Sequence, residues 1–358
     1  MGSTKGLMER YAERICEDIR KASTGEVEVR TVYFGGGTPS LLDASLIGQM
    51  LCAVNDSFEV SRDAEITLEC NPATAREGFF EELRAIGVNR LSIGLQSTDD
   101  GELSSLGRLH SFADFEATYL AARSAGFDNI SVDLMYGLPE QTLEKFENSL
   151  KRVVALSPEH ISSYLLKIEE GTPFFERGER LCLPDEDIQL EMYRRMTNYL
   201  AENGYAKYEV SNFARAGFES RHNVGYWTGR EYLGFGVAAY SFYSGERFGN
   251  SRDLDAFIAG EDIVCERETV GETDAAFEFV MLGMRMGNGI SISEYEKRFN
   301  RSFERDFPSA AKFEAHSLVS REGDRLFFTD EGFFVSNSVL SEFSLDFSKA
   351  VDSHGKML

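Results

Sequence analysis

Short apolar runs alternate with amphipathic segments over most of the first 200 residues. Apolar side chains recur at helical spacing from Leu7 to about residue 22, which predicts an amphipathic helix ending before Gly25. Strand-like and helix-like segments then alternate five times. The predicted strands are 31–37, 65–70, 90–96, 131–136 and 160–168, and the predicted helices are 45–58, 76–86, 112–125, 143–156 and 185–203.

Five strand-then-helix repeats predict parallel strands joined by crossover helices. Both a (β/α) barrel and an open doubly wound sheet satisfy this pattern. In either architecture, ligands bind where the strands reach their carboxyl ends. Candidate chemistry is therefore expected at the strand ends.

The first predicted strand ends in Gly35-Gly36-Gly37, followed by Thr38, Pro39 and Ser40. Glycines carry no Cβ, so a ligand can approach their backbone N–H groups directly. Thr38 adds a hydroxyl group, and Pro39 fixes the direction of the chain. A strand-to-helix turn that binds no ligand is the alternative.

Polar side chains also follow the next four strands: Glu69, then Gln96 with Arg108, then Asp133, and finally Tyr164 and Lys167. Taken singly, each of these is more often a cap or a surface group. Together, two carboxylates, an amide and a guanidinium suit a small zwitterionic ligand rich in hydroxyl groups. Carboxylates accept hydrogen bonds from ribose hydroxyls or an ammonium group, and arginine binds a carboxylate.

Composition and charge narrow the choice of function. Hydrophobic residues make up 42% of the 358 residues, as in a globular protein, and the net charge is −23. This acidic excess argues against a nucleic-acid partner. The five cysteines are scattered and odd in number, which predicts neither a disulfide framework nor a local metal loop. Without a signal peptide or a long apolar stretch, a cytoplasmic protein with no transmembrane segment is expected.

Several longer motifs carry a family resemblance. They are Tyr-Phe-Gly-Gly-Gly-Thr-Pro-Ser (33–40), Leu-Glu-Cys-Asn-Pro (68–72), Asn-Arg-Leu-Ser-Ile-Gly-Leu-Gln-Ser (89–97), Leu-Gly-Arg-Leu-His-Ser (106–111), Asp-Leu-Met-Tyr-Gly-Leu-Pro-Glu-Gln-Thr (133–142), Tyr-Glu-Val-Ser-Asn-Phe-Ala-Arg (208–215) and Arg-His-Asn-Val-Gly-Tyr-Trp (221–227). Over roughly residues 8–345 the chain resembles the oxygen-independent coproporphyrinogen III oxidase-like branch of the radical S-adenosylmethionine (SAM) proteins. Within that branch it is most similar to the heme chaperones.

The resemblance implies an α/β fold, a partial TIM-type (β/α)₆ barrel that binds SAM at the carboxyl ends of its strands. Carried over to this sequence, the implied SAM contacts, called here the strand-end set, are Gly36, Gly37, Thr38, Glu69, Gln96, Arg108 and Asp133.

Proteins of this family begin with a strand and a CxxxCxxC loop whose three thiolates bind a [4Fe–4S] cluster. This sequence contains no such loop, and Cys16 alone cannot replace three ligands. We therefore expect an N-terminally truncated copy whose barrel lacks its first strand and whose residues include no metal ligand and no catalytic group. Radical chemistry is not expected from it, and SAM binding is expected to be weak.

The resemblance also implies heme as a ligand. His222, Tyr226 and Trp227 match an HNxxYW motif linked to heme handling, with His222 as the candidate ligand and the two aromatic side chains as an apolar wall. The implied partners are heme-accepting proteins, with peripheral membrane contact during delivery. A strand over 234–240 is expected to close this part of the chain near residue 250.

The remaining residues predict a separate small domain. Helices are expected at 277–286, 292–299 and 310–317, followed by a hairpin over 318–328 that turns at Glu322-Gly323-Asp324. This resembles the winged-helix-like C-terminal domain of the same family. The expected division is a barrel with the heme motif (1–250), a connector (251–271), the C-terminal domain (272–345) and a polar tail (346–358).

Three functions follow as hypotheses. The first is a heme-binding chaperone that delivers heme to respiratory proteins and depends on SAM and a [4Fe–4S] cluster in its intact form. The second is an oxygen-independent coproporphyrinogen III oxidase-type enzyme of porphyrin biosynthesis. The third is an inactive truncated paralogue. The HNxxYW match favours the chaperone.

Overall fold

The computed structural model describes residues 4–23, 27–74 and 76–355. The chain forms two compact units. Unit 1 comprises Met1–Gln189 and Tyr232–Thr269, and unit 2 comprises Leu190–Glu231 and Val270–Leu358. Each unit is described by itself below.

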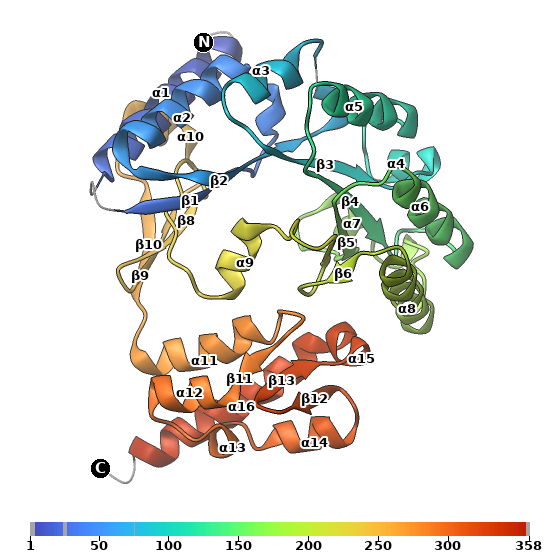
Figure 1. The fold of residues 1–358 in the computed structure, drawn as a ribbon, viewed down its shortest axis with the longest axis vertical. Coiled ribbons are helices and arrows are strands. Elements are labelled where there is room, and N and C mark those ends of the chain that lie inside the picture. Colours follow the sequence, from blue (N-terminus) through green and yellow to red (C-terminus); the bar gives the residue numbers. More distant parts are fainter. Residues whose placement is uncertain (1–3, 24–26, 75, 356–358) are drawn as a thin grey trace. The chain divides into compact units, whose positions relative to one another are not determined.

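Unit 1 is built on a curved parallel sheet (Figure 1). Each strand pairs in parallel with the next one along the chain. This consecutive order is that of a partial (β/α) barrel, whereas a doubly wound sheet reverses its order partway. The strands are β1 (Glu28–Phe34), β2 (Glu59–Cys70), β3 (Arg90–Gln96), β4 (Ile130–Tyr136) and β5 (His160–Leu165).

The crossover helices cover the outer face of this sheet (Figure 1). The side chains of Leu91, Ile93 and Leu95 on β3 point toward these helices and are fully buried. Their alternation with polar residues separates a hydrophobic outer core from a polar inner face. The helices of this region are α1 (Thr4–Lys21), α2 (Ala44–Ser57), α3 (Phe79–Ala85), α4 (Asp100–Ser105), α5 (Phe112–Ser124), α6 (Leu143–Ala155) and α7 (Pro173–Arg177).

The inner face of the sheet is unusually polar for a barrel. Arg90 and Ser92 on β3 and Ser131 on β4 alternate with the buried apolar residues, and all three are nearly inaccessible to solvent. Ser92 lies opposite Glu69 of β2 on one side and opposite Ser131 on the other. The sheet thus presents a row of polar side chains leading up to its carboxyl end.

A second, antiparallel sheet completes unit 1, with β8 (Tyr240–Tyr243), β9 (Glu246–Asn250) and β10 (Val264–Thr269) around α10 (Leu254–Ala259). The strand predicted over 234–240 is therefore wrong. This segment turns instead, with left-handed backbone at Gly236 (φ +99°). A Cβ at Gly236 would lie only 2.4 Å from the hydroxyl oxygen of Tyr11, so the turn packs closely on α1.

Unit 2 contains most of α8 (Glu186–Glu202), the short antiparallel pair β6 (Ala206–Lys207) and β7 (Asn212–Ala214), and α9 (Arg221–Trp227). Its C-terminal part confirms the predicted hairpin, formed by β12 (Val319–Glu322) and β13 (Arg325–Phe328). The remaining elements are β11 (Ile290–Ser291), α11 (Glu272–Gly283), α12 (Ile292–Phe299), α13 (Phe303–Asp306), α14 (Ser309–Ala315), α15 (Asp330–Phe334) and α16 (Ser336–Gly355).

The polar tail predicted over 346–358 is wrong as far as residue 355, and 356–358 lie outside the described residues. Helix α16 continues through this stretch. The ring of Phe347 stacks on that of Phe307 with centroids 5.5 Å apart, and Phe343 contacts the same ring at 5.5 Å. The segment is thus part of an aromatic core.

Four predicted boundaries also shift. β1 ends at Phe34, before the glycines, and β2 begins at Glu59 rather than at residue 65. β5 ends at Leu165 rather than at residue 168. α3 begins only at Phe79, because its N-cap, Gly78, has a left-handed φ of 74° that cannot continue a helix.

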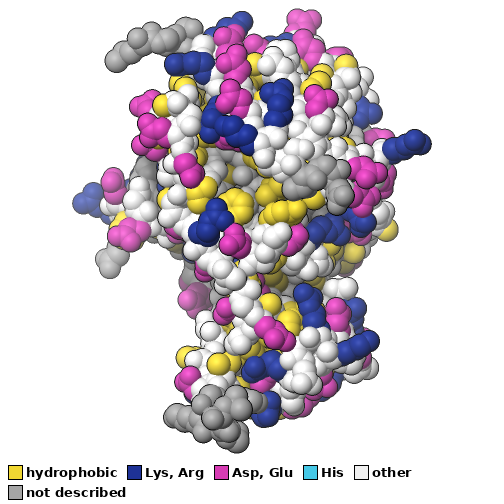
Figure 2. All heavy atoms as spheres, turned by 90° about the vertical axis from the view of Figure 1, so that its left-hand side faces the viewer, with side chains coloured by type: hydrophobic (Ala, Val, Ile, Leu, Met, Phe, Trp, Pro, Cys, Tyr) yellow, Lys and Arg dark blue, Asp and Glu magenta, His cyan; other side chains and the backbone are white. Residues whose placement is uncertain are grey.

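Acidic and basic side chains are interspersed on the face shown in Figure 2, which displays no basic stripe. Within residues 4–23, 27–74 and 76–355, none of the helices combines the length and hydropathy needed to cross a membrane.

Candidate functional site

The carboxylate of Glu69, at the end of β2, organises the glycine loop that follows β1. The hydroxyl of Tyr33 donates to Oε1 of Glu69 at 2.8 Å, and the backbone N–H of Gly36 donates to Oε2 at 3.2 Å. Gly35 lies between them, and a Cβ there would be 2.6 Å from the Tyr33 ring. The absence of a side chain at Gly35 is therefore what allows this close approach.

A second contact joins the same two strand ends. The backbone N–H of Asn71 donates to Oγ of Ser40 at 3.0 Å, and the Ser40 hydroxyl also lies 2.6 Å from that of Thr74. Ser40 is buried. The glycine motif and the Glu-Cys-Asn-Pro motif thus form one connected loop structure.

Asp133, on the inner face of β4, is held by serine hydroxyls. Ser92 donates to Oδ1 at 3.1 Å, and Ser162 of β5 also donates to this carboxylate. Burial raises the pKa of Asp133 to about 6, with a further rise from Glu69, whereas the two serines and Arg90 act in the opposite direction. Asp133 therefore changes charge close to neutral pH.

Gln96 occupies a distorted position at the end of β3. The register between β3 and β4 shifts between Gly94 and Gln96, and Gln96 has a left-handed φ of 74°. A Cβ at Gly94 would lie 3.0 Å from Nε2 of Gln96, so the amide folds back over the glycine. Gly94 is paired with Asp133 in the sheet, which places this amide beside the Asp133 strand. Bulges and strained backbone of this kind are frequent at functional sites.

Arg108 follows α4 and is attracted to Asp133, while partial burial lowers the pKa of its guanidinium. Its loop is anchored by His110, whose Nε2 lies 3.2 Å from the carbonyl oxygen of Leu95 on β3. His110 is buried, and burial lowers the pKa of its imidazole. The loop therefore holds Arg108 over the strand end that carries Gln96.

A buried carboxylate links two more motif loops. The hydroxyl of Ser97 donates to Oε2 of Glu102 at 2.6 Å, and the amide of Gln141 donates to the same oxygen at 3.0 Å. Ser97 follows Gln96, and Gln141 belongs to the loop after β4. Glu102 thus fixes the spacing between the ends of β3 and β4.

All seven members of the strand-end set lie in unit 1 at the carboxyl ends of the strands. The structure joins Gly36 to Glu69 by a hydrogen bond and groups Glu69, Asp133 and Arg108 electrostatically. For Gly37 and Thr38 it shows only their place in the loop. The supporting residues Tyr33, Ser92 and Ser162 were not predicted. Strict alternation along β1, β3 and β5 was the signal that could have found them.

The five cysteines are unpaired and include buried Cys16 and Cys70. Across the described parts of the chain, no three His, Cys, Asp or Glu side chains converge as metal ligands would. These residues therefore do not fit a [4Fe–4S] cluster. The strand-end set does fit SAM, because it offers carboxylate, amide and guanidinium groups on adjacent strand ends.

The predicted heme residues lie on α9 of unit 2. His222 and Tyr226 are one helical turn apart, with Nε2 of His222 3.0 Å from the Tyr226 hydroxyl oxygen and the ring centroids 4.8 Å apart. Tyr226 is 39% exposed, and His222 is partly exposed. This face of α9 therefore presents an imidazole and an aromatic ring to solvent.

Trp227 makes separate contacts. Its indole N–H donates to the carboxylate of Glu209, and the guanidinium of Arg285 lies over its ring at 5.6 Å from the centroid. Glu209 is 1% exposed, and burial raises its pKa to about 7. Sequence reasoning named the Tyr-Glu-Val-Ser-Asn motif but gave Glu209 no role.

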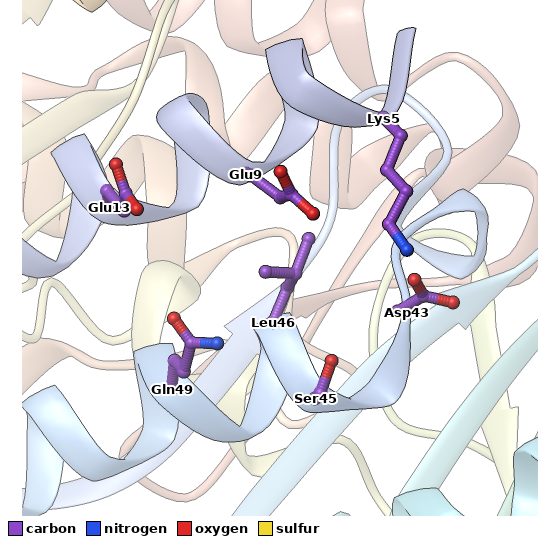
Figure 3. Close-up of a pocket in the computed structure, with 7 residues that line it drawn as sticks. All are labelled: Lys5, Glu9, Glu13, Asp43, Ser45, Leu46 and Gln49. Carbon is purple, nitrogen blue, oxygen red and sulfur yellow. The ribbon is translucent and has the colours of Figure 1, made fainter. Parts of the chain in front are cut away.

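A surface pocket between α1 and α2 contains no member of the strand-end set (Figure 3). Glu9 and Glu13 line it from α1, and Leu46 and Gln49 line it from α2. Its acidic lining shows no ligand chemistry of its own.

Comparisons with known proteins agree with this geometry. The sequence model of the Radical SAM superfamily matches residues 2–153, and that of the HemN C-terminal domain matches residues 270–335. The fold is similar to that of coproporphyrinogen III oxidase (HemN) from Escherichia coli, described as a radical SAM enzyme. The TM-score is 0.81 at 22% identity, over 96% of this chain and 84% of that one. The fold is thus that of a radical SAM protein.

Closer relatives narrow the family. The chain is 33% identical to the heme chaperone HemW of Lactococcus lactis over 94% of its own length and 89% of that protein. It is 34% identical to the heme chaperone HemW of Bacillus subtilis over 90% of its own length and 87% of that protein. The chain therefore belongs to the heme chaperone HemW family within the radical SAM superfamily.

Proposed function

We propose that this protein binds heme through His222 and passes it to heme-accepting proteins. The observation that carries this proposal is the accessible His222–Tyr226 face of α9 in a member of the HemW family. Imidazole is a common axial ligand of heme iron. Tyr226 and Trp227 supply aromatic surface next to it.

The other described histidines are poorer candidates. His110 and His160 are buried within unit 1. His316, after α14, is exposed, but its Nδ1 lies 2.7 Å from the carbonyl oxygen of Lys312, and the nearest aromatic side chain of its helix, Phe313, is buried. His222 alone among these four combines access to solvent with an exposed aromatic neighbour.

We further propose that the strand-end set binds SAM. Glu69 and Asp133 accept hydrogen bonds from the ligand's hydroxyl or ammonium groups, and Arg108 binds its carboxylate. Gln96 donates or accepts through its amide, and the loop of Gly36, Gly37 and Thr38 leaves room for close approach. In radical SAM proteins the bound ligand supplies radical chemistry together with a cluster. The described residues support the binding role only.

Setting and organisation complete the proposal. The acidic composition and scattered cysteines favour action in the cytoplasm, with respiratory proteins as heme acceptors and contact at a membrane surface during delivery. Residues 1–250 and 272–345 are proposed as the two functional domains, joined by 251–271.

The test is a heme-transfer assay. The full chain is loaded with ferric heme and mixed with apomyoglobin as a neutral acceptor, and the Soret band of the acceptor is followed over time. We expect transfer from the wild type, no loading of His222→Ala, and wild-type behaviour for the control His316→Ala. Heme that binds but never leaves, or equal loading of His222→Ala, would contradict the proposal.

A further inference from the structure

Helix α9 is too short to hold its own orientation, since seven residues make about two turns. Its position must therefore come from side-chain contacts. The described residues provide contacts at both ends of the helix, and two of them come from adjacent residues of one motif, Tyr208 and Glu209.

At its start, α9 is held by Tyr208. The N-cap residue Ser220 is fully buried, and its backbone N–H donates to the Tyr208 hydroxyl at 3.2 Å. The Ser220 side chain in turn accepts from the backbone N–H of Asn223 at 3.3 Å. This end of the helix is thus both capped and tethered.

At its end, α9 is held by Glu209 through Trp227. The Glu209 carboxylate accepts the indole N–H of Trp227 and also the backbone N–H of Ser211, the latter at 3.0 Å. Glu209 forms a β-bridge with Met286 just after α11, and α9 packs against α11. The chain around Glu209 is therefore itself fixed to the C-terminal part of unit 2.

Arg285 closes the arrangement from the other side of the indole ring. Its guanidinium lies over Trp227 and is attracted to Glu209, and its Nη2 donates to the side chain of Asn337 on α16. Arg285 is the charged group that faces Glu209 from α11, Trp227 faces it from α9, and Asn212 donates from its own segment.

We propose that Glu209 is a positioning residue for heme binding. It holds Trp227, and through Trp227 it fixes the pose of α9 from which His222 meets the heme. Burying a carboxylate is costly unless it is hydrogen-bonded, so a buried glutamate placed on one indole N–H has a specific purpose. This inference rests on the proposed function of His222.

The first arm of the test needs no heme. Trp227 is the only tryptophan of the chain, so its fluorescence emission reports on the Glu209 contact directly. Ionisation of Glu209, with its pKa of about 7, changes the acceptor of the indole N–H. We expect the emission of the full chain to titrate between pH 6 and pH 8. The titration should vanish in Glu209→Gln and persist in His222→Ala, which controls for imidazole ionisation.

The second arm measures heme affinity by absorbance titration. Glu209→Ala and Trp227→Phe, which lacks the indole N–H, should each weaken binding at least fivefold, and the double variant should be no weaker than the worse single variant. Glu209→Gln retains an acceptor and should restore most of the affinity. Far-UV circular dichroism confirms that each variant is folded, and Trp227→Phe carries the test if Glu209→Ala does not fold.

The outcomes separate the two proposals. If the wild type binds heme through His222 but the Glu209 and Trp227 variants bind equally well, the positioning role is wrong and the heme function stands. If the emission titrates as expected but the wild type binds no heme, the contact is real and the heme function is wrong, which removes the positioning role as well. A flat emission profile overturns the positioning role alone.

Discussion

Nε2 of His222 lies 3.0 Å from the hydroxyl oxygen of Tyr226, one helical turn along α9. The nitrogen that most readily coordinates heme iron is thus already engaged within the protein. Heme binding through this atom requires the hydroxyl contact to break. Tyr226 therefore competes with the heme iron for the imidazole, although its ring borders the same surface.

This competition predicts that Tyr226→Phe binds heme more tightly. A net hydrogen bond contributes about 1 kcal/mol, so removing it should tighten binding about fivefold. The ring remains, so the apolar contact is retained. The dissociation constant from a heme titration measures the effect, and a weaker complex would show that the hydroxyl assists binding instead.

The glycine loop predicts a sharp contrast between neighbouring positions. Gly35→Ala would place a Cβ 2.6 Å from the Tyr33 ring and 2.9 Å from Glu69, whereas a Cβ at Gly37 meets nothing within 4 Å. We expect Gly35→Ala to lower the free energy of unfolding by about 1–3 kcal/mol through overpacking. The control Gly37→Ala should stay within about 0.5 kcal/mol. Urea unfolding measures both, and equal effects would contradict the close packing around Glu69.

The raised pKa of Asp133 predicts how stability depends on pH. An unfolded aspartate ionises near pH 4, but Asp133 in the folded chain keeps its proton up to about pH 6. Its contribution to the free energy of unfolding is therefore largest below pH 4 and is lost as the pH rises through 6. Asp133→Asn should flatten the profile over this window.

Asp114 provides a control of opposite sign. Its backbone and side-chain hydrogen bonds with Ser111 lower the pKa of this exposed carboxylate. Its stabilising contribution is present above pH 4 and is lost as the pH falls below that value. Asp114→Asn should therefore change the acid limb of the profile and leave the pH 4–6 window unchanged. A profile for Asp133→Asn that follows the wild type would contradict the assignment to Asp133.

Helix α16 predicts that the end of the chain is needed for stability. Phe347 is buried against Phe307, whereas Leu345, two residues earlier on the same helix, is 55% exposed. Phe347→Ala should lower the free energy of unfolding by about 3 kcal/mol. Leu345→Ala should cost less than about 0.5 kcal/mol. Equal stability of the two variants would mean that this segment is a tail.

The barrel was predictable because its signal is local and repeated. Leu91, Ile93 and Leu95 show strand periodicity in the sequence, and helical spacing follows each strand. The order of the strands was not fixed by that pattern, which also suited a doubly wound sheet. Residues 346–355 were misjudged because Phe347 is isolated among polar residues, and only its packing on Phe307 shows that it is core.

The site could be predicted residue by residue but not as a set of contacts. Glu69 and Asp133 stood out as carboxylates at strand ends. The bulge that turns Gln96 back over Gly94 depends on pairing with β4, which lies about 40 residues away in the sequence. Glu209 was missed for a similar reason, because its partners Trp227 and Arg285 are distant along the chain and its burial cannot be deduced from its neighbours.

The most direct test of the central claim is the absorbance spectrum of ferric heme titrated into the full chain and into His222→Ala. The claim predicts a shifted Soret band that saturates at one heme per chain in the wild type and in His316→Ala, and that is absent in His222→Ala. The same saturating band in His222→Ala would contradict it.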